Sequence, residues 1–149
     1  NALEPRGTGP FIIAHIVNDR SLTWGGGFAK QVALKYSEAQ NDYRKWAKIA
    51  GNRELGKTHF FGDARRLEIA SMIAQHGHGA SSGPRIRYPA LEQCLRSVRK
   101  RASEVRASIH MPRIGCGAAG GKWEIVEELI ERELISQRLD VTVYELPRA

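Results

Sequence analysis

Two glycine-rich segments are the parts of this sequence whose residue types and spacing favour chemistry. Residues 23–28 read Thr-Trp-Gly-Gly-Gly-Phe, and residues 114–123 read Ile-Gly-Cys-Gly-Ala-Ala-Gly-Gly-Lys-Trp. Glycine lets the backbone approach a ligand closely and adopt positive φ. Consecutive free N–H groups at the start of a helix then bind an anion without a lysine. Two such loops on one sheet suit a diphosphate flanked by sugars; the alternative is two turns that happen to be rich in glycine.

The second segment fits the familiar phosphate and metal motifs incompletely. Gly115, Gly117 and Gly120 have the G-x-G-x-x-G spacing of dinucleotide-binding folds. That fingerprint normally opens its fold, whereas one helix and one strand follow it here. A P-loop centred on Lys122 would have cysteine and tryptophan where glycine and Ser/Thr belong. His76 and His78 lack paired cysteines that would complete a zinc site. We therefore expect neither a metal nor a cofactor.

Cys116, between two glycines, is a candidate nucleophile. No neighbour in the sequence is suited to act as its base, and a small residue is also what a phosphate-binding loop needs. Cys94 lies in a very different context, so we expect no pairing between the two cysteines. The pattern predicts a reducing interior, cytoplasmic or, in a eukaryote, nuclear.

The rest of the chain supplies the elements that must position these loops. A nearly continuous apolar run at residues 11–17 predicts a strand buried on both faces, and further strands are predicted at 58–61, 67–75, 108–114 and 141–146. Helices are predicted at 28–48, in one or two pieces, and from residue 88 and residue 123 onward. The last two carry apolar stripes, formed by Tyr88, Leu91, Leu95, Val98, Ala102 and Val105 and by Trp123, Val126, Leu129, Ile130 and Leu134. Strands alternating with helices predict a largely parallel sheet between two helical layers.

The length indicates one domain over residues 1–149. No apolar run approaches the roughly 20 residues that cross a bilayer, and the N-terminus lacks a signal pattern, so we expect no membrane contact. The formal net charge is +7, and the basic residues gather between Arg85 and Arg106. This basic helix is either solvated surface or a face that attracts a polyanion such as nucleic acid.

Several segments together carry a resemblance to a known family. They are Ile-Ala-His-Ile-Val-Asn-Asp at 13–19, Trp-Gly-Gly-Gly-Phe at 24–28, Ser-Met-Ile-Ala-Gln at 71–75, Arg-Tyr-Pro-Ala-Leu-Glu at 87–92, and His-Met-Pro-Arg-Ile-Gly-Cys-Gly at 110–117 with Trp123. From about residue 11 to residue 146 the chain resembles the macrodomains, in the branch of the chromatin-remodeller macrodomain and the terminal ADP-ribose–protein glycohydrolases. The resemblance implies a three-layer α/β/α fold with a mostly parallel mixed central sheet, and ADP-ribose as the ligand.

The resemblance also implies a set of site residues. Both glycine loops would wrap the diphosphate, while Asn18 and Asp19 would border the distal ribose, where a substrate linkage would lie. The catalytic candidates are Asp19 and His76; the alternatives are a local turn or helix cap for the first and an ordinary loop histidine for the second. The implied ADP-ribose-binding residues are Asn18, Asp19, Trp24, Gly25, Gly26, Gly27, Phe28, Gln75, His76, Gly77, Ile114, Gly115, Cys116, Gly117, Ala118, Ala119, Gly120 and Gly121.

This chain departs from the family pattern in two places. Ala119 stands where the glycohydrolase subgroup has a catalytic aspartate, and Gln75-His76 aligns with the region of its catalytic lysine, so we expect no covalent lysine mechanism. The family's first strand ends in Gly-Asp, whose aspartate binds adenine, while this chain starts just downstream of that motif. Either that strand is missing from this chain, or another residue, with Glu4 as a candidate, holds adenine.

Three functions remain open. The leading one is hydrolysis of the ester between mono-ADP-ribose and Glu or Asp side chains of proteins, in which Asp19, His76 or the substrate's own phosphate activates the water. The second is a non-catalytic reader of ADP-ribosylated proteins or poly(ADP-ribose), which the missing catalytic pair favours. The third is a nucleic-acid-binding module that uses the basic helix. Similarity to compact stand-alone domains favours the enzyme.

Overall fold

The molecule is built on a twisted sheet that the sequence pattern anticipates closely. The computed structural model describes residues 1–145, and in them a five-stranded sheet has the order β2-β3-β1-β4-β5. β1 pairs in parallel with both β3 and β4, β4 pairs in parallel with β5, and only β2 runs antiparallel, in a hairpin with β3. The strands are β1 (Phe11–Asn18), β2 (Thr58–Asp63), β3 (Leu67–Gln75), β4 (Ser108–Pro112) and β5 (Val141–Tyr144).

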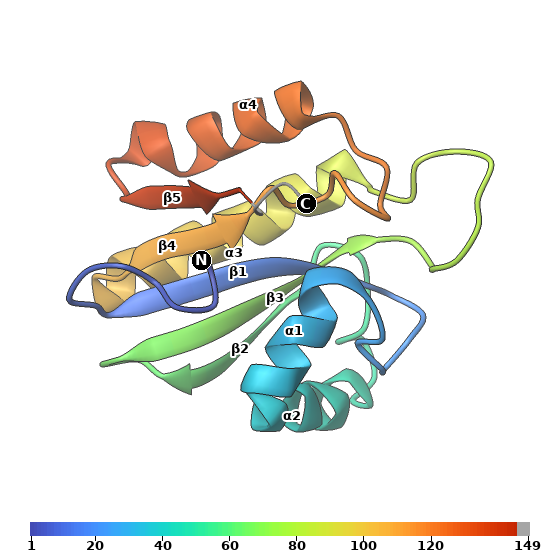
Figure 1. Ribbon diagram of the computed structural model, residues 1–149, viewed down its shortest axis with the longest axis horizontal. Coiled ribbons are helices and arrows are strands. Elements are labelled where there is room, and N and C mark those ends of the chain that lie inside the picture. Colours follow the sequence, from blue (N-terminus) through green and yellow to red (C-terminus); the bar gives the residue numbers. More distant parts are fainter. Residues whose placement is uncertain (146–149) are drawn as a thin grey trace.

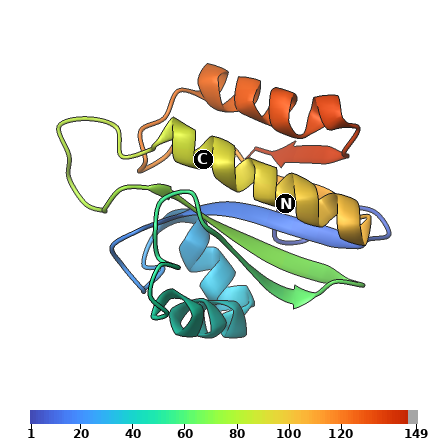
Figure 2. The ribbon, with the colours of Figure 1, turned by 180° about the vertical axis from the view of Figure 1, so that it is seen from behind.

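Helices cover both faces of the sheet, giving three layers. α1 (Gly27–Lys35) and α2 (Ser37–Ala47) lie on one face, in front of the strands in Figure 1. α3 (Tyr88–Val105) and α4 (Trp123–Glu133) belong to the other face, and α3 lies in front of the sheet in Figure 2. A short 3₁₀ turn, η1 (Ile135–Gln137), follows α4. The α/β/α fold with a mostly parallel sheet is therefore confirmed. Among residues 1–145 no helix is long and apolar enough to cross a membrane.

The central strand β1 contributes to two hydrophobic cores at once. Ile12 and Ala14 pack in the core under α3 and α4, whereas Ile13 and Val17 pack in the core under α1 and α2. Successive side chains of a strand point to opposite faces, so an unbroken apolar run fits a strand covered on both sides. Burying each of the larger side chains contributes about 1.5–3 kcal/mol of transfer free energy. This packing fixes the position of the strand that carries the first glycine loop.

The expected elements differ from the observed ones mainly at their ends. The expected helix at 28–48 is two helices, divided at Tyr36, whose φ of −123° and ψ of 66° are not helical. The strand expected to reach residue 114 ends at Pro112, because the N–H of Ile114 turns back to the carbonyl of Pro112 at 2.8 Å. The last strand is β5, and residue 146 of its expected span lies outside the described residues.

Candidate functional site

Three loops meet at the carboxyl ends of the parallel strands. They follow β1 (residues 19–26), β3 (residues 76–87) and β4 (residues 113–122). Main-chain hydrogen bonds join them: the N–H of Asp19 donates to the carbonyl of Gln75 at 3.0 Å, and the N–H of Arg85 donates to the carbonyl of Ala119 at 2.8 Å. The edge of a parallel sheet where such loops gather is the usual ligand site of α/β folds.

Two of these loops present runs of unpaired backbone donors. In the part of the chain that the structure describes, the N–H groups of residues 25–29 and of residues 115–119 donate no hydrogen bond. The first run opens α1, which has no side-chain cap and no acidic residue in its first turn. A Cβ built on Gly26 or Gly117 would have nothing within 4 Å. Runs of unpaired N–H groups beside open space, one run at a helix N-terminus, form an anion-binding arrangement.

Asp19 and His76, each a candidate from the sequence, contact each other in the structure. Asp19 Oδ2 lies 2.8 Å from His76 Nδ1, and Asp19 Oδ1 accepts the N–H of Gly77 at 2.8 Å. The aspartate side chain is 13% exposed and the histidine side chain is 40% exposed. Each oxygen of the carboxylate is thus fixed by a hydrogen bond, while the imidazole is partly exposed to solvent.

The ionisation of Asp19 decides how its partner is protonated. Burial raises the pKa of this carboxyl, but the hydrogen bonds from Gly77 and His76 together outweigh burial, so its pKa lies below the ordinary value. Asp19 is therefore a carboxylate at neutral pH and has no proton to donate. His76 Nδ1 must therefore be the donor in the hydrogen bond to Asp19, and Nε2 takes no part in that bond. An imidazole oriented by a carboxylate in this way is suited to accept a proton.

Other predicted site residues support the first loop instead of facing open space. Asn18 Oδ1 accepts the N–H groups of Arg20 at 2.9 Å and Ser21 at 2.7 Å, which shapes the turn after β1. The Trp24 side chain is only 5% exposed and belongs to the core under α1 and α2, where its ring packs edge-on against His15. Phe28 is half-buried beside the same histidine. These contacts hold the glycine loop against the sheet.

Gln75 and Gly77 shape the turn after β3. The Gln75 side-chain amide donates to the carbonyl of Gly77 at 3.0 Å. Gly77 is buried and has a φ of +68°, a conformation that glycine adopts without strain. Glu4, the candidate for adenine, pairs with Lys35 at 2.8 Å. Lys35 ends α1, so Glu4 lies at the opposite end of that helix from the glycine loop.

Arg85 is a residue of this site that the sequence did not reveal. The sequence interpretation places it in the basic segment, which is predicted to be either solvated surface or a face that attracts a polyanion. In the structure its guanidinium donates to main-chain carbonyls of the loop that carries His76. These contacts join residues close in sequence, but no local pattern of residue types announces them.

Cys116 lies within the second glycine loop as a thiol. Its Sγ is 3.5 Å from the carbonyl of Ile114, and burial raises its pKa above the ordinary value. A protonated thiol is a poor nucleophile, so its chemistry agrees with a residue that only needs to be small. Cys94 is also a free thiol, in the core, where burial raises its pKa to about 11. Within residues 1–145 no three His, Cys, Asp or Glu side chains are grouped to hold a metal ion.

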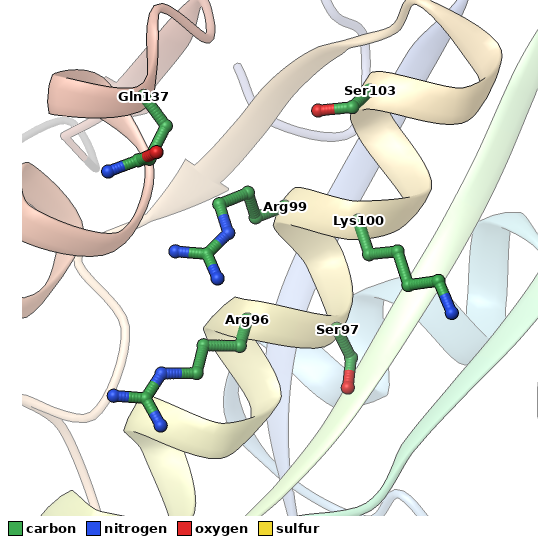
Figure 3. Close-up of a pocket in the computed structure, with 6 residues that line it drawn as sticks. All are labelled: Arg96, Ser97, Arg99, Lys100, Ser103 and Gln137. Carbon is green, nitrogen blue, oxygen red and sulfur yellow. The ribbon is translucent and has the colours of Figure 1, made fainter.

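A shallow depression lies away from these loops, on the exposed side of α3. It has a volume of about 610 Å³, and Figure 3 shows the six residues that line it, Arg96, Ser97, Arg99, Lys100, Ser103 and Gln137. Arg99 extends toward Gln137 in Figure 3, and Arg96 and Arg99 each lie 3.2 Å from the buried carboxylate of Glu133. Much of the positive charge here is therefore neutralised within the fold, and contact with a polyanion stays a prediction.

The fold and the loops together define a class of protein. Residues 17–130 match the Macro domain family, which covers most of the chain. The chain belongs to the macro domain family, as the sequence resemblance predicted.

Curated relatives and solved structures agree with this assignment. The chain is 32% identical over 144 residues to a chromodomain-helicase-DNA-binding protein 1-like of Danio rerio, matching 89% of this chain and 14% of that protein. It is 27% identical over 172 residues to an ADP-ribose 1''-phosphate phosphatase of Saccharomyces cerevisiae, matching 98% of this chain and 95% of that protein. The chain thus spans a small part of the first relative and nearly all of the second.

Two solved structures match the chain along nearly its whole length. One is a protein of unknown function from Bacteroides thetaiotaomicron, with 44% identity, a TM-score of 0.91, and coverage of 97% of this chain and 93% of that one. The other is a macrodomain protein from Streptomyces coelicolor, with 36% identity, a TM-score of 0.84, and coverage of 98% and 95%.

Proposed function

We propose that this macrodomain binds ADP-ribose between its two glycine loops and hydrolyses the ester that joins mono-ADP-ribose to a Glu or Asp side chain of a protein. The observation that carries the proposal is the contact between Asp19 and His76, in loops adjacent to two runs of unpaired N–H groups. The loops supply the binding and the imidazole supplies the base.

Binding rests on the match between the ligand's diphosphate and the two loops. A diphosphate carries negative charge on oxygens that only accept hydrogen bonds. The donors of residues 25–29 and 115–119 are unpaired in the free protein, so binding breaks no bond between protein groups. The N-terminus of α1 adds the positive end of the helix dipole. Donors that are fixed in advance need no reorganisation when the ligand arrives.

The reaction needs one proton transfer at the distal ribose. His76 Nε2 removes a proton from water, the water oxygen attacks the anomeric carbon, and the bond from that carbon to the ester oxygen breaks. The Glu or Asp side chain leaves as a carboxylate, and the ribose keeps the new hydroxyl. Asp19 stays ionised and stabilises the imidazolium that forms, as the carboxylate of a catalytic triad does.

The name of the yeast relative supports hydrolysis at the distal ribose. That protein is an ADP-ribose 1''-phosphate phosphatase, and the match covers 98% of this chain. ADP-ribose 1''-phosphate is accordingly a second substrate to offer in any assay of this protein.

A reader without chemistry is the alternative, and one observation favours it. Both oxygens of Asp19 already accept hydrogen bonds from the protein, and Ala119 supplies no second carboxylate. If His76 does not act on water, the same loops would recognise ADP-ribosylated protein and leave it intact.

The experiment follows release of label from a target ADP-ribosylated on glutamate. His76→Gln should lower turnover by ~10²–10⁴-fold, the usual contribution of a general base, and Asp19→Asn should lower it less. His78→Gln is the matched control, because His78 is an exposed histidine of the same loop, and it should leave turnover unchanged. Calorimetry should show ADP-ribose affinity unchanged in both site variants.

Two results would redirect the proposal. Release of ADP-ribose at the wild-type rate by His76→Gln and Asp19→Asn would assign the base to the substrate's own phosphate. Tight ADP-ribose binding by a wild-type protein that cleaves neither acidic-residue esters nor ADP-ribose 1''-phosphate would identify a reader.

A further inference from the structure

All three nitrogens of the Arg85 guanidinium donate hydrogen bonds to one loop. Nη1 donates to the carbonyl of His76 at 3.0 Å, Nε donates to the carbonyl of Gly79 at 2.9 Å, and Nη2 donates to the carbonyl of Ala80 at 2.8 Å. These carbonyls belong to the segment that leaves β3 and carries the candidate base. Arginine's planar fork of donors suits such a set, whereas the lysine ammonium is a single point charge on a flexible stem.

The main chain of Arg85 joins the same loop to the second glycine loop. Its carbonyl accepts the N–H of His76 at 2.8 Å, and its own N–H donates to the carbonyl of Ala119 at 2.8 Å. Ala119 ends the run of unpaired donors at residues 115–119. One residue therefore connects the histidine on one side with the anion-binding backbone on the other.

The absence of a side chain at Gly77 leaves room for the Arg85 guanidinium. A Cβ built on Gly77 would lie 2.9 Å from Arg85 Nη1. A side chain at position 77 would therefore displace the guanidinium from beneath the loop. No carboxylate in residues 1–145 forms a salt bridge with Arg85, so its bonding capacity goes to the loop carbonyls.

Beyond Gly77 the loop has little else to hold it. Between residues 77 and 83 it consists of glycine, serine, alanine and histidine, and residues 78–83 are exposed. In Figure 1 it is the long yellow-green excursion that projects from the molecule between β3 and α3. Asp19 and Gln75 bond the main chain of Gly77, but within residues 78–83 the side-chain hydrogen bond other than those of Arg85 is the long one from the N–H of Gly83 to Ser81 Oγ, at 3.4 Å.

We propose that Arg85 is the positioning residue of this site. It fixes the main chain at His76 so that the imidazole meets Asp19, and it ties that geometry to the backbone that receives the phosphates. This inference rests on the proposed function, because it assigns to Arg85 the placement of the proposed base. Arg85 itself touches no reacting atom.

The test compares two arginine-to-lysine changes that each preserve charge. Arg85→Lys removes the fork beneath the loop. Arg87→Lys is the matched control, because the Arg87 guanidinium donates at 2.9 Å and 3.1 Å to the carbonyls of Pro84 and Ile86, which lie outside residues 76–80, the part of the loop that the Arg85 guanidinium bonds. Each variant is assayed for kcat and KM on the ester substrate and for ADP-ribose affinity. The ring-proton resonances of His76 are followed by NMR in the free protein.

Arg85→Lys should lower kcat by ~10–100-fold with KM and ADP-ribose affinity within about threefold, because a small misplacement of a catalytic group costs rate more than binding. The His76 ring resonances should shift or broaden, and Arg87→Lys should match the wild type in every measurement. Wild-type kcat and unchanged His76 resonances in Arg85→Lys would overturn the proposal.

The NMR measurement tests the positioning role of Arg85 independently of the proposed hydrolase activity. If the wild-type protein hydrolyses nothing but Arg85→Lys still moves the His76 resonances, Arg85 positions His76 and the ester hydrolase is wrong. If Arg85→Lys unfolds, Arg85→Gln, which keeps a donor for one carbonyl, repeats the same comparison against Arg87→Gln. His76 resonances unchanged in a folded Arg85→Gln would again overturn the assignment.

Discussion

The carbonyl oxygen of Gly115 accepts a hydrogen bond from the N–H of Gly121 at 2.6 Å, and this bond closes the loop that follows β4. A Cβ on Gly121 would lie 2.5 Å from the same oxygen, so no side chain fits there. Gly115 has a φ of +75°, and a Cβ on it would meet Ile86. Gly117, inside the loop, has nothing within 4 Å. The glycines at the ends of this loop therefore serve its closure, and the middle one faces open space.

This division predicts opposite phenotypes for neighbouring glycines. Gly117→Val should abolish ADP-ribose binding and leave the melting temperature of the free protein nearly unchanged, because its side chain would fill the place of the phosphates. Gly26→Val should behave in the same way. Wild-type protein should bind in the micromolar range, about −8 kcal/mol. Calorimetry that finds unchanged affinity in both variants would remove the phosphates from these loops.

Gly121→Ala provides the contrast, because its methyl group would meet the backbone. Overpacking of this kind usually costs about 1–3 kcal/mol of stability. We expect a lower free energy of unfolding in urea, with ligand binding weakened only as the loop is displaced. Stability equal to the wild type would mean that the loop adjusts freely, and the division between closing and facing glycines would be wrong.

Cys116→Ala should retain most of the activity. The raised pKa of this thiol, caused mainly by burial, keeps it protonated at neutral pH. We also expect Cys116 to react with iodoacetamide more slowly than a free cysteine, and more slowly still when ADP-ribose is present. Mass spectrometry after timed alkylation measures both rates, with Cys94→Ser used to report Cys116 alone. Complete loss of turnover in Cys116→Ala would restore the nucleophile hypothesis.

Acid should destabilise the protein before its carboxylates titrate. Burial lowers the pKa of His15 to about 3, and it also lowers the pKa values of His59 and His110. Unfolded histidines take up protons near pH 6.5, whereas these buried rings resist them. The unfolded state therefore binds more protons, so stability is lost as pH falls from about 6.5 toward 3, by at most about 1.4 kcal/mol per pH unit for each ring.

Urea unfolding at about pH 7.5 and pH 5 checks this dependence. His15→Asn should be less stable than the wild type at the higher pH, because its ring no longer bonds Ser71 Oγ at 2.7 Å. The same variant should lose less stability on acidification, because it has one fewer buried ring to protonate. Equal wild-type stability at both values would mean that these histidines titrate in the native state.

Chelators should change neither the fold nor the reaction. The proposed chemistry uses only backbone donors, an imidazole and a carboxylate, and the described residues offer no cluster of ligands for a metal ion. The measurement is the melting temperature and turnover before and after dialysis against EDTA. A loss of either that is restored by one added metal ion would contradict the mechanism.

The sequence predicts the fold well because its signals are local. The apolar run of β1 and the apolar stripe of α3 each follow from residues close together in the chain, whereas the sequence pattern leaves the position of the break at Tyr36 open. Local patterns do not predict which residues of different strands become neighbours, because this depends on strand register. Asn18 pairs with Gln75 across β1 and β3, so Asp19 and His76, the residues that follow them, become neighbours. Both were candidates from the sequence, but their contact depends on which strands are adjacent.

The direction in which a side chain points is even harder to predict from the sequence than strand register. Trp24 belongs to a glycine-rich loop that resembles a ligand site, yet its ring faces the core. Glu133 is a charged residue at the end of α4, yet it is buried against Arg96 and Arg99. Arg85 belongs to a basic segment, yet it bonds loop carbonyls. In each case the residue type predicts an environment that differs from the observed one. The observed environment is set by contacts with residues distant in the sequence, or by a turn of the loop.

β1 is the third strand across the sheet but the first along the described residues. Its neighbours begin at residues 67 and 108, and both lie parallel to it, so each pairing must wait for a crossover segment. Closing such long loops costs entropy before the strand contacts repay it, which slows folding. A nascent chain halted before residue 108 therefore has an apolar strand with an open edge, prone to pair with other chains. ADP-ribose cannot help such a chain to fold, because the loop that would hold half of its diphosphate has not yet been synthesised.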